Sequence, residues 1–207
     1  ENNILDATQA FTLHISDSKR LSGLPEHALI TARELAQEKS LDGYVLTLEA
    51  PCFQAVMSYC DDRALREQIY QAYVTRASDQ GPNANHFDNT ELMNEILRLR
   101  HEKAQLLGFK NYSELSLATK MAESPNQVID FMLNLISRAR NQGLLEFEEL
   151  ERFAKEQLQI SPFNPWDSSY ASEKRRQALY SLSQEELRPY FPQPKVMHGL
   201  FATIHKL

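Results

Sequence analysis

Helical hydrophobic spacing, interrupted at short intervals by capping residues, most limits the fold of this chain. Residues 25–39 place apolar side chains on one stripe behind a proline suited to the first helical position. Two further stretches, 61–76 and 88–108, begin with Asp or Asn caps, and the second ends at a glycine suited to a left-handed C-cap. The spacing predicts an all-α protein, a multi-helix array of seven to nine helices with at most one or two short strands.

The second half of the chain continues this pattern. Ser124 precedes a proline, which predicts a helix start, and the apolar spacing predicts that this helix ends near Gly143. A separate helix should then run to Leu158, and Asp167 should cap another that runs through Tyr180. Further helical segments are predicted at 1–8, at 183–192 behind a capping box, and at 196–207.

One stretch departs from helical spacing. Residues 44–48 alternate and are rich in β-formers, which predicts a short strand. Because one strand cannot form a stable sheet alone, it should either pair with a strand outside this chain or simply be extended. No linker is polar enough to divide the chain, so residues 1–207 are predicted to form a single helical segment with no internal boundary.

Composition and charge exclude several classes of partner. Acidic residues outnumber basic ones, 28 to 22, and the net charge of -6 argues against a nucleic-acid partner. No apolar run approaches the ~20 residues that span a bilayer, so no membrane partner is expected. With no secretory leader, Cys52 and Cys60 are predicted to be free thiols in a reducing cytoplasm.

His101 and Glu102 open the nearest approach to a zinc-peptidase motif. The H-E-x-x-H motif needs a second His four residues after the first, so that both imidazoles share one helix face. Here that position holds Gln105, a poor zinc ligand. His198 and His205 lie about 10 Å apart along a predicted helix, too far to share one metal. The residues therefore predict no catalytic group and no metal site in this chain, and its substrate-binding residues stay unknown.

Two other clusters have ordinary structural interpretations. Residues 173–176 are charged and mostly basic, which is typical of a solvated helix face. The densest aromatic region favours burial of ring area, with a peptide-binding wall as the functional alternative. Its members are Trp166, Tyr170, Tyr180, Tyr190 and Phe191.

Several segments, taken in order, resemble the thimet-oligopeptidase family of zinc metallopeptidases. Residues 76–83 favour its oligopeptidase A branch over the dipeptidyl carboxypeptidase branch. One departure is Ala171, because the family often has two successive tyrosines where this chain has Tyr170 and Ala171. The segments that carry the resemblance are 3–8, 64–66, 75–83, 95–102, 106–109, 116–122, 165–167 and 187–192.

The resemblance implies a parent enzyme with a larger helical peptidase shell around a deep channel. Zinc would be held by H-E-x-x-H and a third Glu, none of which maps onto this chain. The parent would hydrolyse short unfolded peptides. This chain would form part of the channel wall, inactive alone, with the remainder of the same polypeptide as its partner. A non-enzymatic helical binding or scaffold module and a dipeptidyl carboxypeptidase are the two alternatives.

The ends of the chain suggest an excised piece of a longer protein. The first residue is Glu1 rather than Met, in a segment that already has helical spacing. The last predicted helix has no Gly, Asn or Pro to stop it. We therefore expect the natural gene product to be longer than this chain.

Overall fold

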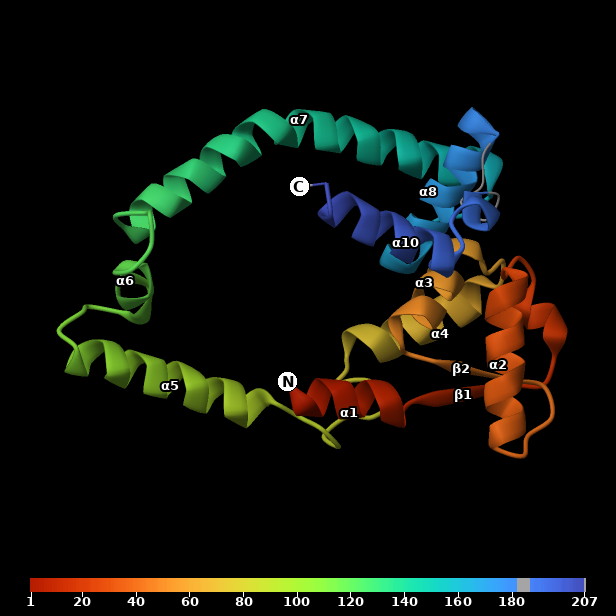
Figure 1. Ribbon diagram of the computed structural model, residues 1–207, viewed down its shortest axis with the longest axis horizontal. Coiled ribbons are helices and arrows are strands. Elements are labelled where there is room, and N and C mark those ends of the chain that lie inside the picture. Colours follow the sequence, from red (N-terminus) through yellow and green to blue (C-terminus); the bar gives the residue numbers. More distant parts are fainter. Residues whose placement is uncertain (182–186, 207) are drawn as a thin grey trace.

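The computed structural model describes residues 1–181 and 187–206 and confirms the predicted all-α class. Within the described residues, nine α-helices accompany one two-stranded sheet (Figure 1). The first elements are α1 (Asn2–Ala10), β1 (Thr12–Ile15), η1 (Ser18–Leu21), α2 (Glu26–Glu38), β2 (Tyr44–Thr47), α3 (Ala50–Tyr59) and α4 (Arg63–Val74). The later ones are α5 (Thr90–Leu106), α6 (Tyr112–Leu117), α7 (Pro125–Gln157), α8 (Pro165–Tyr180), η2 (Arg188–Tyr190) and α10 (Gln193–Ile204).

The predicted strand at 44–48 has its partner inside this chain, so the expectation of an outside partner or a lone extended segment was wrong. β2 pairs antiparallel with β1, and the register sets Thr12 opposite Thr47 and Ile15 opposite Tyr44. β1 has only four residues, but residues 11–16 alternate apolar and polar side chains, a strand signal that the helical prediction missed. The pairing allows Val45 and Leu46 to be buried on the two faces of the sheet.

The main core lies in the first third of the chain. The sheet packs against α2 and α3, and α4 adds its inward-facing stripe. Leu65, Ile69 and Ala72 form the inward-facing stripe of α4 and are all buried. α8 returns from far along the sequence to pack on α3 and α4, and a smaller cluster around Ala154, Ile160 and Tyr170 joins it to α7.

Between α4 and α8 the chain leaves this core and comes back. Figure 1 shows α5 and α7 along opposite sides of an open frame, with α6 at the end farthest from the core. The prediction that a helix ends near Gly143 was wrong, because α7 runs 33 residues from Pro125 to Gln157. A glycine in a helix interior costs about 1 kcal/mol relative to alanine, which disfavours the helix without ending it.

The helices of this frame expose the apolar stripes that the sequence predicts. On α5, Leu92, Ile96, Leu99 and Leu106 are all exposed. The predicted C-cap is confirmed, since Gly108 follows the helix with a φ of +81°. The capping box predicted at 183–186 lies outside the described residues. Of the helices that the structure describes, none is long and apolar enough to cross a membrane.

Candidate functional site

The most enclosed polar site of the described chain joins α4 to α8 around Asp167. Asp167 is fully buried and receives Nη2 of Arg63 at 2.8 Å and Nη2 of Arg66 at 2.9 Å. The expectation that Asp167 caps α8 was wrong in detail. Asn164 is the N-cap, and Asp167 stands three residues later, where its carboxylate accepts from the Asn164 backbone N–H at 3.1 Å. The Asp167 carboxylate therefore accepts a backbone hydrogen bond at the start of α8 and also pairs with two arginines.

Arg66 is itself almost completely buried, with 1% of its side chain exposed. Its remaining donors reach the carbonyl oxygens of Cys60 at 2.7 Å and Trp166 at 3.2 Å. Its guanidinium also lies over the Tyr170 ring, 4.0 Å from the ring centre. Because every side of the guanidinium has a partner, this buried cation is paired as buried charges require.

The adjacent carboxylates Asp61 and Asp62 point to different partners, as expected for neighbouring residues. Asp61 accepts from the Tyr170 hydroxyl at 2.8 Å and pairs with Lys174 at 3.4 Å. Asp62 accepts from the Leu65 backbone N–H at 3.0 Å, which caps α4, and pairs with Arg20. We call Arg63, Arg66, Asp61, Asp62, Asp167 and Tyr170 the Asp167 cluster.

The electrostatics of the Asp167 cluster keep its groups in their usual charge states at neutral pH. Burial raises the pKa of Asp167, but hydrogen bonds from Arg63 and Arg66 outweigh it, so the net pKa is lowered. Burial together with the Asp61 hydrogen bond raises the pKa of Tyr170 to about 12. Burial raises the pKa of the Cys60 thiol to about 11. The ion pairs and hydrogen bonds of the cluster join the start of α4 to α8.

These carboxylates predict how stability changes with pH. The net pKa values of Asp61, Asp62 and Asp167 are lowered in the folded state. Their ionised carboxylates therefore stabilise the fold at any pH above their unfolded-state pKa, and this stabilisation is lost as the pH falls through their folded-state pKa values. We expect the free energy of unfolding to be level from pH 7 to about 5 and to decline below about 4, measured by urea titration.

The variant Asp62→Asn supplies the control for this pH dependence. Asparagine keeps the N-cap acceptor but cannot titrate. The free energy of unfolding of the variant should therefore decline less steeply at low pH than that of the unsubstituted chain. Identical slopes for the two proteins would contradict the role assigned to Asp62.

The charged run at 173–176 is not the solvated face that its composition predicts. Glu173 is 7% exposed and pairs with Arg176 on the same helix. Arg175 pairs with Glu149 of α7, and Lys174 with Asp61. The run therefore connects α8 to α7 and to the start of α4.

The residues nearest to a zinc motif lie on the solvated side of α5. Glu102 pairs with Arg98, and the Gln105 amide donates to the Lys110 carbonyl oxygen at 2.8 Å. Across residues 1–181 and 187–206, no group of three or more His, Cys, Asp or Glu side chains is placed to hold a metal. His198 lies within α10 and His205 at its C-terminal end.

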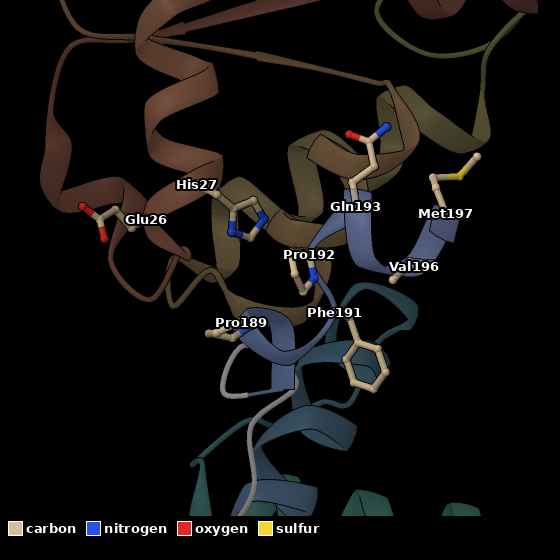
Figure 2. A pocket seen from close by; sticks show the side chains of 8 residues that line it. All are labelled: Glu26, His27, Pro189, Phe191, Pro192, Gln193, Val196 and Met197. Atoms are coloured by element: carbon tan, nitrogen blue, oxygen red, sulfur yellow. The ribbon is translucent and has the colours of Figure 1, made fainter. Parts of the chain in front are cut away.

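The predicted burial of the aromatic region is confirmed only in part. Tyr170 is buried, whereas Tyr180, Tyr190 and Phe191 are 66–71% exposed. Phe191 lines an open pocket of about 720 Å³ between the start of α2 and the segment that enters α10. Figure 2 shows the His27 ring and the Pro192 ring facing each other across it. The pocket brings together few polar groups, so its geometry assigns no chemistry.

Comparison with known proteins identifies the family. The sequence model of peptidase family M3 matches residues 56–207. Oligopeptidase A of Escherichia coli (strain K12) is 54% identical over 100% of this chain, and that of Haemophilus influenzae is 51% identical. Dipeptidyl carboxypeptidase of Escherichia coli (strain K12) is 29% identical over 99% of the chain. The chain spans about 30% of the length of each of these relatives. With most of its residues matched by the family model, the chain belongs to peptidase family M3.

Proposed function

We propose that this chain is a non-catalytic helical part of a zinc-dependent oligopeptidase that hydrolyses short unfolded peptides in the cytoplasm. The observation that carries the proposal is the 54% identity to oligopeptidase A over the full length of this chain. The 29% identity to dipeptidyl carboxypeptidase disfavours release of C-terminal dipeptides as the parent activity.

The arrangement of the described helices supports a role in the wall of the enzyme. The long helices α5 and α7 frame a wide region, while the buried charges gather at the far end, between α4 and α8 (Figure 1). Because the described residues hold no zinc site, the metal and the groups that act on the peptide bond would come from the rest of the polypeptide. We propose that residues 1–207 act there as one unit, held by the Asp167 cluster.

Peptide cleavage by the whole protein and by this chain tests the proposal. The whole protein that carries this sequence should cut a quenched fluorescent oligopeptide at an internal bond and lose activity with a zinc chelator. The 207-residue chain should cut nothing and retain no stoichiometric zinc on metal analysis. Product lengths decide between internal cleavage and dipeptide release. Cleavage by the isolated chain, or one tightly held zinc per chain, would overturn the proposal.

A further inference from the structure

The first part of α5 exposes an apolar side, whereas α6 packs on the C-terminal part of the helix, where Ala104 is buried. Successive residues of a helix turn by about 100°, so its apolar side chains fall within an arc of roughly 180°. The opposite arc carries Glu95, Arg98 and Glu102, which form ion pairs with one another.

α5 therefore has one solvated side and one mainly apolar side, on which Arg100, over the Tyr112 ring, and Lys103 are the charged members. The apolar side chains there, 46–64% exposed, are Leu92, Met93, Ile96, Leu97 and Leu99.

The first half of α7 is apolar over an even wider arc. Its large side chains between 128 and 136 occupy roughly 200° around the axis, whereas a helix that lies on a single core shows a stripe of about 100°. A polar stripe remains between the edges of this arc, formed by Asn126, Gln127, Asp130, Asn134 and Ser137. The exposed apolar members, at 36–63%, are Val128, Ile129, Phe131, Met132, Leu133, Leu135 and Ile136.

α10 presents a third apolar side. Its large apolar residues fall within roughly 140° of the helix axis, a single face. Figure 1 shows α10 extending from the core into the region between α5 and α7. The exposed apolar members, at 42–58%, are Val196, Met197, Leu200, Phe201 and Ile204.

We infer that the remainder of the polypeptide covers these surfaces, packing on one side each of α5 and α10 and on more than one side of the first half of α7. Exposed apolar area of this extent is unfavourable in water and is typical of an interaction surface. The occupant is the same polypeptide because relatives that match this chain over its full length have more than two thirds of their length outside it. The inference rests on the proposed function only in requiring a longer parent protein.

The five methionines of the chain can report on these surfaces without any substitution. Met93, Met132 and Met197 lie on the apolar sides of α5, α7 and α10. Met57 is 4% exposed and is the buried control, and Met121, in the turn between α6 and α7, is fully exposed. Mild peroxide treatment followed by peptide mass spectrometry gives the oxidation rate of each.

In the 207-residue chain, the three surface methionines should oxidise nearly as fast as Met121, since oxidation follows exposure. In the whole protein they should slow by about tenfold or more, toward the rate of Met57. An unchanged Met132 rate in the whole protein would overturn the inference. Protection in the chain alone that disappears on dilution would also overturn it, because the occupant would then be a second copy.

Peptidase activity measured on the same samples separates this inference from the proposed function. Protected methionines in a whole protein that cleaves no peptide would support the packing inference and reject the proposed activity. Cleavage by a whole protein whose Met93, Met132 and Met197 oxidise freely would reject the packing inference and leave the activity standing.

Discussion

Replacing Asp167 with alanine should destabilise the core by about 3–5 kcal/mol, the usual cost of removing one partner of a buried ion pair. The cost arises because Arg66, 1% exposed, would be left as an uncompensated charge beside α8. The loss of the Arg63 ion pair should contribute less to this cost, because 35% of the Arg63 side chain is exposed to solvent. Urea unfolding followed by the fluorescence of Trp166, the single tryptophan and the neighbour of Asp167, measures the change.

Two further variants show whether the lost charge pair is the cause. Arg98→Ala removes a solvent-exposed arginine that also contacts two carboxylates, and it should leave the unfolding midpoint unchanged. Arg66→Met added to Asp167→Ala removes the stranded charge and should recover part of the stability, because apolar replacement of buried pairs is often tolerated. Equal destabilisation by Arg98→Ala, or a double variant less stable than Asp167→Ala, would contradict the role of the Asp167 cluster.

Helix starts could be predicted from the sequence because capping is a local interaction. Ser124 accepts from the backbone N–H of Gln127, and Asp62 from that of Leu65, each within three residues. The same holds for Gly108, whose positive φ follows from the end of α5 alone. Such signals depend only on neighbouring residues, so the existence and type of these helices were predicted correctly.

The Asp167 cluster was not predicted because its partners are far apart in the sequence. Arg66 and Asp167 are 101 residues apart, and no local pattern announces their pairing. A signal was nevertheless present, since Arg66 lies between the inward-facing Leu65 and Ile69, and an inward charge needs a buried partner. β1 is a different case, because residues 11–16 alternate apolar and polar side chains and this local signal was missed, while its pairing with β2 could not be read from either strand alone.

Gly143 shows the limit of reading a helix end from composition. Its predicted role as a stop rested on propensity, but an ideal Cβ at this position would meet no other atom within 4 Å, and the helix continues through it. Nothing in the surroundings requires a glycine there. Propensity is a weak prior, and the flanking apolar residues on both sides outweigh a cost of about 1 kcal/mol.

The apolar stripes themselves were predicted, but we infer that polypeptide outside this chain covers them. A single substitution can test this inference. Ile136→Asp should change the stability of the 207-residue chain by less than about 0.5 kcal/mol, because Ile136 is 55% exposed there. In the whole protein the same carboxylate would be enclosed without a partner, and we expect a loss of at least about 3 kcal/mol by urea unfolding.

Asn134→Asp is the matched control for this contrast. It adds the same charge to the same helix two residues away, on the polar stripe that should still face water in the whole protein. It should therefore be tolerated in both proteins. If Ile136→Asp were tolerated as well as Asn134→Asp in the whole protein, the apolar arc of α7 would face solvent there. That result would contradict the inference that other parts of the polypeptide pack on this wide apolar arc.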